Sequence, residues 1–212
     1  MKIVYLVIAI AGLSAGCSNP TRSRDLGNPE VSSLTLAQQV CSDCHGLTGS
    51  AVSPNFPNLA GQTPAYLVAQ LKSYKNHGRR ELADLEYMWG LSRSLTDAQI
   101  DGLAAYYAKQ QPVRQPIEGD ELRMAAGKTI FEKGLPAQNV AACTACHGTS
   151  GAGIETFPRI SGQHIDYAIK QLKVFQLTDQ RPAGVVMKTV VHELTGDDIA
   201  NVAAYLQALP NR

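Results

Sequence analysis

Two short strings decide the organisation of this chain: C-S-D-C-H at residues 41–45 and C-T-A-C-H at residues 143–147. The sequence around them is repeated as well, because F-P-N-L-A-G-Q at residues 56–62 matches F-P-R-I-S-G-Q at residues 157–163. Each copy holds its own complete set of such features. This pattern indicates two duplicated domains and not a solenoid of many short repeats.

The sequence between the copies marks a domain boundary. The stretch Q-Q-P-V-R-Q-P-I-E-G contains two prolines and a glycine, which are residues that interrupt helices. We therefore predict five parts in chain order, namely a signal peptide, a tether, a first domain, a linker and a second domain, over residues 1–16, 17–30, 31–112, 113–119 and 120–212.

The sequence pattern within each copy predicts an all-α fold. The last helix of each copy begins with a capping box, formed by Thr96 with Gln99 and by Thr195 with Asp198. Apolar residues recur at helical spacing after each box, and no segment alternates with the period of two that is typical of a strand. We expect the earlier helices near residues 34–40, from Pro64, from Leu122 to Lys133 and from Ile165.

The composition excludes several classes of protein. Hydrophobic residues make up 44% of the 212 residues, which is too many for a disordered chain. Lys and Arg number 19 against 18 Asp and Glu, so there is no basic excess with which to bind nucleic acid. Aromatic residues are only 6%, so something other than aromatic side chains must help to fill the core.

The C-x-x-C-H string is typical of covalent haem attachment. Its two cysteines add their thiols to the two vinyl groups of a haem, and the histidine that follows lies beneath the iron and ligates it. A haem is also a large apolar body, which accounts for the low aromatic content. We therefore predict two covalent haem c groups, attached at Cys41, Cys44, Cys143 and Cys146, with His45 and His147 as iron ligands.

Three other interpretations of the cysteines are weaker. Zinc sites built from two C-x-x-C elements usually place them about 15 to 20 residues apart, and Cys44 and Cys143 are much further apart than that. A thioredoxin-like redox pair belongs to a βαβ pattern, which this sequence lacks. Disulfides form in exported proteins but would leave the two histidines unexplained.

Alignment of the two copies selects the second axial ligand of each iron. Met88 and Met187 occupy matching positions, each on what we expect to be a loop before the last helix, so we predict that they ligate iron. Met124 is expected on a helix face, as a core residue. The remaining histidines are not duplicated, and we expect them on the surface or beside the ligands: His77, His164 and His192.

With these features, residues 31–212 resemble a tandem of two class I cytochrome c domains, as in the dihaem cytochrome c4 family. The resemblance implies that the carbonyl oxygens of Pro57 and Pro158 accept hydrogen bonds from the second ring nitrogen of each haem histidine. It also implies that Arg80 and Arg181 contact the haem propionates.

The N-terminus has the pattern of an export signal. Lys2 precedes an apolar run over residues 3–13, and small residues follow up to Cys17. The end of this segment, L-S-A-G-C, resembles a bacterial lipoprotein signal, so we expect a lipid on Cys17 that anchors the protein to a membrane. Ordinary signal cleavage with an unmodified Cys17 is the alternative. In both cases we expect a periplasmic protein.

A haem iron with histidine and methionine ligands has no vacant position for a substrate, but it can exchange one electron. We therefore expect an electron-transfer protein and not an enzyme. The resemblance implies a respiratory chain, with electrons taken from a bc-type complex or a dehydrogenase and passed to a terminal oxidase. The alternatives are an electron-transfer subunit of a periplasmic oxidoreductase, a dihaem peroxidase-like enzyme and a haem-based sensor. The last two need an open position on the iron.

Overall fold

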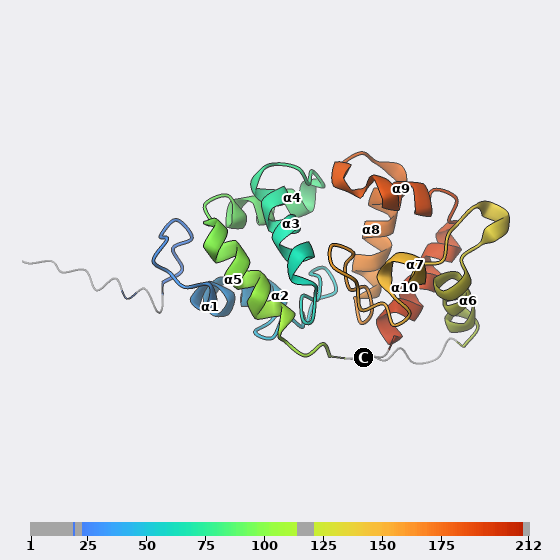
Figure 1. The fold of residues 1–212 in the computed structure, drawn as a ribbon, viewed down its shortest axis with the longest axis horizontal. Coiled ribbons are helices and arrows are strands. Elements are labelled where there is room, and N and C mark those ends of the chain that lie inside the picture. Colours follow the sequence, from blue (N-terminus) through green and yellow to red (C-terminus); the bar gives the residue numbers. More distant parts are fainter. Residues whose placement is uncertain (1–18, 20–22, 114–120, 210–212) are drawn as a thin grey trace, which may run out of the picture.

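Helices and their connecting loops form two bodies that lie side by side along the long axis of the molecule (Figure 1). The computed structural model describes residues 19, 23–113 and 121–209. Within these residues the only β-type pairings are two isolated bridges, one in each of two loops of the second body. The predicted signal peptide, Cys17 and the predicted linker beyond Val113 lie outside the described residues.

The first body holds five α-helices and one π-helical turn. They are α1 (Ser33–Leu36), η2 (Ala37–Cys41), α2 (Ser42–His45), α3 (Pro64–Lys75), α4 (Leu82–Ser92) and α5 (Asp97–Ala108). The helix expected near residues 34–40 is therefore present as α1 and the π-helical turn that follows it.

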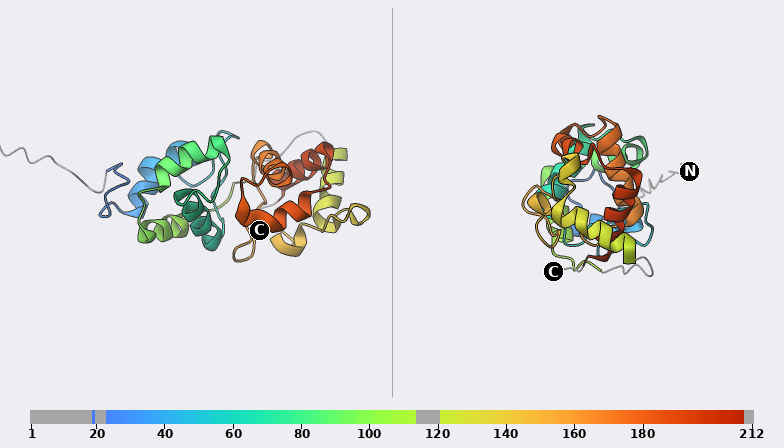
Figure 2. Two further views of the ribbon diagram at one scale, coloured as in Figure 1. Left: turned by 90° about the horizontal axis from the view of Figure 1, so that it is seen from above. Right: turned by 90° about the vertical axis from the view of Figure 1, so that its right-hand side faces the viewer.

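The second body repeats this order with a longer first helix. Its elements are α6 (Glu121–Lys133), η3 (Pro136–Gln138), α7 (Thr144–His147), α8 (Ile165–Leu177), η4 (Pro182–Gly184), α9 (Val185–Val191) and α10 (Gly196–Ala208). The left view of Figure 2, seen from above, shows the same separation into two helical halves.

Both last helices begin at the capping boxes that the sequence predicts. The Thr96 hydroxyl accepts from the backbone N–H of Gln99 at 3.1 Å, and the Gln99 side chain accepts from the backbone N–H of Thr96 at 2.9 Å. Thr195 and Asp198 form the same pair of contacts at 3.1 and 2.9 Å. Each box satisfies backbone donors that have no partner within the helix, which is worth about 1 kcal/mol.

The first and last helices of each domain cross at close range, and one glycine allows each crossing. In the first domain a Cβ added to Gly102 of α5 would lie 2.2 Å from the hydroxyl oxygen of Ser33 in α1. In the second domain the glycine is on the other helix, because a Cβ added to Gly127 of α6 would lie 2.1 Å from the carbonyl oxygen of Asn201 in α10. Both domains therefore pack the same helix pair over their apolar cores.

The repeated G-Q strings join the two domains in a symmetric contact, which we call the glutamine clasp (Gln62, Arg159, Gln163 and Asn58). The side chain of Gln62 donates to the carbonyl oxygen of Arg159 at 2.9 Å and accepts from its N–H at 2.6 Å. Gln163 does the same with Asn58, donating at 3.1 Å and accepting at 2.9 Å. Each glutamine thus pairs with backbone of the opposite domain, as in an isologous interface.

None of the helices in the described part of the chain is both long enough and apolar enough to cross a membrane.

Candidate functional site

A cavity of about 940 Å³ is lined by residues of both domains. Most of its lining is apolar side chain, drawn from the helices and from the loops that follow α2 and α7. It brings together the residues that the sequence selects as haem attachments and ligands: Cys41, Cys44, His45, Met88, Cys143, Cys146, His147 and Met187.

Helical geometry presents the first C-x-x-C-H string to this cavity. Cys41 ends the π-helical turn, and α2 continues directly into Cys44 and His45. Residues three and four apart share one helix face, so all three side chains reach the same space. Gly46 follows with a φ of 75° and turns the chain away after the histidine.

A backbone carbonyl fixes the ring of each histidine. Nδ1 of His45 lies 2.9 Å from the carbonyl oxygen of Pro57, and Nδ1 of His147 lies 2.8 Å from that of Pro158. Burial lowers the pKa of both imidazoles, and the proline carbonyls oppose that shift in part. A neutral ring that donates from Nδ1 has a lone pair on Nε2, which is the arrangement of a metal-ligating histidine.

The cysteines that begin the two strings, Cys41 and Cys143, are half-buried. Burial raises the pKa of Cys41 and of Cys143 to about 11, so both are protonated at neutral pH. The four described cysteines form no disulfides. Both strings therefore offer two free thiols beside an apolar space, as thioether formation with vinyl groups requires.

Met88 and Met187 line the cavity, but they lie within helices and not on loops as the sequence analysis expected. Met88 is in α4, whose Leu, Ala and Glu residues are good helix formers. Met187 is in α9, a short helix rich in valine, which packing against the rest of the domain must stabilise. Met124 is half-buried on α6 and does not line the cavity.

The unduplicated histidines lie away from the two strings. His77 and His192 are exposed. His164 is only 4% exposed, and its Nε2 lies 3.0 Å from the carbonyl oxygen of Ala51 in the other domain. None of the three lines the cavity.

The arginine that corresponds to Arg181 in space is Arg79 and not Arg80. Arg80 is exposed, and its Nε donates to the carbonyl oxygen of His77 at 3.2 Å. Arg79 lies over the ring of Tyr74 at 4.4 Å, as Arg181 lies over the ring of Phe175 at 4.5 Å. The loops that carry these arginines differ in length between the two copies, so an alignment with a constant offset selects the wrong residue.

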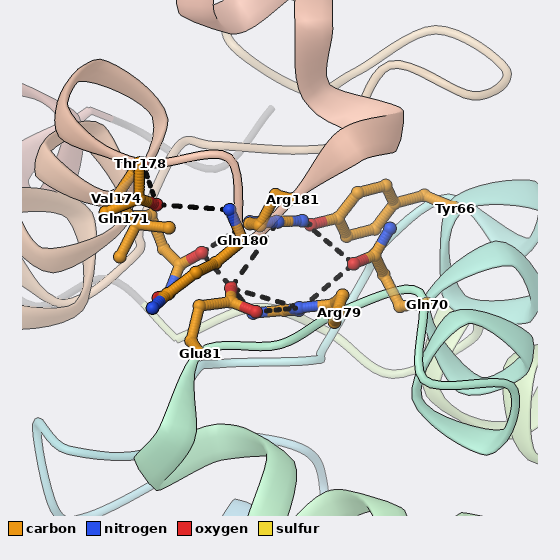
Figure 3. A network of polar contacts seen from close by, with 9 residues as sticks. All are labelled: Tyr66, Gln70, Arg79, Glu81, Gln171, Val174, Thr178, Gln180 and Arg181. Carbon is orange, nitrogen blue, oxygen red and sulfur yellow. Dashed lines mark hydrogen bonds and ion pairs between the residues drawn. The ribbon is translucent and has the colours of Figure 1, made fainter.

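Arg79 and Arg181 meet at the domain boundary in a polar network that the sequence analysis missed (Figure 3). Gln70 accepts from both arginines, at 3.0 Å from Arg79 and 2.9 Å from Arg181. Gln171 accepts from both as well. Glu81 forms an ion pair with Arg79 at 2.8 Å and lies 3.5 Å from Arg181. The only sequence signal was Q-L-K, which is repeated at the same place in α3 and α8.

These residues fit a haem in each domain. The cavity supplies an apolar space, two free thiols and a fixed imidazole from each string, and a methionine from α4 or α9. Arg79 and Arg181 line the same cavity and can face the anionic edge of such a group.

Comparison with known proteins identifies the two domains. The family model for cytochrome c matches residues 34–110 and 124–210. Cytochrome c4 of Pseudomonas aeruginosa is 37% identical over 174 residues, which cover 80% of this chain and 84% of that protein. The chain belongs to the cytochrome c4 family.

Two further proteins match the chain over most of its length. The crystal structure of reduced recombinant cytochrome c4 from Pseudomonas stutzeri has a TM-score of 0.76 and 31% identity, covering 87% of this chain and 100% of that one. A Thiomonas intermedia protein named thiosulfate dehydrogenase electron acceptor is 31% identical over 217 residues, covering 96% of this chain and 91% of that protein.

Membership of the cytochrome c4 family decides the cofactor and the class of function. The cysteine pairs in the two cytochrome c domains hold two covalent haem c groups. The protein is a dihaem electron carrier and not an enzyme, so the peroxidase-like alternative is set aside.

Proposed function

We propose that this cytochrome c4 carries single electrons in the respiratory chain of a bacterium. It takes them from a bc-type complex or a dehydrogenase and passes them to a terminal oxidase. The observation that carries the proposal is the paired arrangement around the cavity, where each domain presents one buried histidine and one methionine. Such an arrangement leaves the iron closed to substrates and suited to electron exchange alone.

The proposed iron ligands are His45 with Met88 and His147 with Met187. Pro57 and Pro158 keep each imidazole in one orientation and one tautomer, by accepting from Nδ1. When bound, the haem supplies an iron that changes between the ferric and ferrous states. Methionine sulfur favours the ferrous state and raises the reduction potential.

Arg79 and Arg181 are the proposed partners of the haem propionates, with Arg79 in the place that the sequence analysis gave to Arg80. Both guanidinium groups line the cavity, and each lies over an aromatic ring that restricts its position. Arginine binds carboxylates through a planar pair of donors, which suits a propionate.

A second donor deserves a separate test, because one relative is named for it. The Thiomonas intermedia relative is called a thiosulfate dehydrogenase electron acceptor. Thiosulfate dehydrogenase is therefore a specific candidate for the dehydrogenase that reduces this protein. A subunit of a periplasmic oxidoreductase would accept electrons in the same way as this carrier. The difference is that a subunit stays bound to the dehydrogenase, whereas a carrier leaves it after each transfer.

The proposed location is the periplasm, with a lipid on Cys17 as the membrane anchor. Support comes from the apolar run over residues 3–13 and the small residues that precede Cys17. The part of the predicted tether that the structure describes packs on the first domain, where Leu26 lies against the apolar core and Gln99 donates to the carbonyl oxygen of Asn28 at 3.1 Å.

Electron transfer to an oxidase tests the main proposal. Purified, fully reduced protein is mixed with membranes that contain a terminal oxidase, and oxidation of both haems is followed by absorbance. We expect two electrons to leave each chain, in a reaction that an oxidase inhibitor stops. Oxidation that is equally fast with inhibited membranes would exclude the oxidase as acceptor. Reduction by thiosulfate dehydrogenase, in a separate mixture, distinguishes the two classes of donor.

A further inference from the structure

The polar network between the domains is symmetric in all its main members except one. Each domain gives it one arginine, Arg79 or Arg181, and one glutamine, Gln70 or Gln171. The carboxylate comes from the first domain alone, because Glu81 follows Arg79 by two positions and the residue in the same position after Arg181 is an alanine. Duplication has therefore left one buried charge without a counterpart.

Glu81 is well buried and bound to both arginines. Its side chain is 3% exposed, and the side chains of Arg79 and Arg181 are 5% and 8% exposed. Arg79 donates to the carboxylate from Nε at 3.2 Å and from Nη2 at 2.8 Å. The Nε of Arg181 lies 3.5 Å from the same oxygen. The carboxylate thus neutralises Arg79 more completely than Arg181.

The carboxylate of Glu81 lies outside the lining of the cavity. Both arginines line the cavity, whereas Glu81 does not. Two cations and one anion leave a net positive charge in a buried place, which is unfavourable unless a further anion faces it. Glu81 therefore sets how much positive charge the arginines present to the haem sites.

We propose that Glu81 is a positioning residue that lowers the reduction potential of both haems, by cancelling part of the positive field of Arg79 and Arg181. The inference rests on the proposed function, which places the propionates beside these arginines. Reduction adds one negative charge to a haem, so a nearby cation favours it and a nearby carboxylate opposes it. Burial keeps solvent and salt from screening the effect.

Three variants separate charge from shape. Glu81→Gln removes the charge and keeps the size and one acceptor oxygen. Gln171→Glu adds a carboxylate to the same arginines from the second domain. The double variant Glu81→Gln with Gln171→Glu returns the original charge from the opposite side. The matched control is Glu132→Gln, which removes an ion-paired but exposed carboxylate on α6, next to Lys128.

The readout is a spectroelectrochemical titration of both haems in the purified holoprotein. We expect Glu81→Gln to increase the equilibrium constant for reduction of each haem about tenfold, which raises each reduction potential by about 59 mV for one electron. Gln171→Glu should shift both potentials in the opposite direction. The double variant should return toward the wild-type values, and Glu132→Gln should change the equilibrium less than about twofold.

Two results would overturn the inference. One is a shift in Glu81→Gln that is no larger than in Glu132→Gln, while the absorption band of methionine ligation is intact. The other is a double variant whose potentials stay at those of Glu81→Gln. If Glu81→Gln does not fold, Gln171→Glu decides the matter, because it keeps Glu81 and must lower both potentials. Failure of oxidase to accept electrons from the wild type would refute the proposed function without altering these potentials.

Discussion

Removal of Gln62 should loosen the contact between the two haem domains. The variant Gln62→Ala loses a donor to the carbonyl oxygen of Arg159 at 2.9 Å and an acceptor for its N–H at 2.6 Å. Each hydrogen bond contributes about 0.5–1.5 kcal/mol, so the pair is worth about 1–3 kcal/mol. Gln62 is only 6% exposed, so water does not easily replace the lost partner and the upper part of this range applies.

The second half of the glutamine clasp predicts the same loss. Gln163→Ala removes the matching pair of hydrogen bonds to Asn58, at 3.1 and 2.9 Å, and should also cost about 1–3 kcal/mol. Both glutamines act across one interface, so their effects should not be independent. In the double variant we expect a larger loss than in either single variant, while the contact of His164 with the carbonyl oxygen of Ala51 still joins the domains at this edge.

Urea unfolding of the holoprotein measures these effects. Haem absorbance and far-ultraviolet circular dichroism are followed together, and the free energy of unfolding is extrapolated to water. The matched control is Gln110→Ala, because the Gln110 side chain makes one hydrogen bond to the carbonyl oxygen of Tyr106, within its own domain. The control should cost less than about 1 kcal/mol. Equal losses in Gln62→Ala and Gln110→Ala would show that the clasp does not stabilise the domain contact.

Three further predictions concern the haem sites and the anchor. Met187→Ala should remove one methionine–iron absorption band, lower one reduction potential and allow cyanide to bind one haem. The control Met124→Ala should leave the iron ligation and both reduction potentials unchanged. An unaltered spectrum in Met187→Ala would refute the assignment of Met187 as a ligand. Arg79→Gln should shift the reduction potentials in a redox titration, and Arg80→Gln should not, because of these two arginines only Arg79 lines the cavity. The opposite pattern would show that Arg80 is the propionate partner, as the sequence pattern predicted. Cys17→Ser should release the mature protein from membranes into the soluble fraction, and mass spectrometry of the wild type should find a lipid on Cys17; an unmodified N-terminus would exclude the anchor while leaving export intact.

Much of the fold could be predicted because its signals are local. A capping box needs only residues three apart, so Thr96 and Thr195 identify the starts of α5 and α10 from sequence alone. The C-x-x-C-H strings are local too, since one helical turn brings both cysteines and the histidine to one face. Family resemblance then supplied the tandem of two cytochrome c domains, which the comparisons confirm.

The errors arose where an answer depends on tertiary contacts. Met88 and Met187 were expected on loops because each precedes the last helix of its domain, but both lie in helices, and the valine-rich α9 is helical because it packs against its domain. Arg79 was missed because its role depends on which side chain reaches the cavity, and Arg80 aligns better in a repeat of constant offset. The G-Q strings were recognised as repeats, yet similarity between copies does not show whether a repeated residue acts within its own domain or across the boundary.

The duplication limits where the two haems can differ. Both histidines are held by a proline carbonyl at nearly the same distance, and both domains present a methionine from the same place in the fold. With the proposed ligands, ligand identity does not set one haem apart from the other. A difference between them must then come from charges and contacts around the ligands, and the charges that lack a charged counterpart in the other domain include the buried Glu81 and the cavity-lining Arg159. In a carrier whose two centres exchange electrons with different partners, such a charge can alter the potentials without disturbing the ligands.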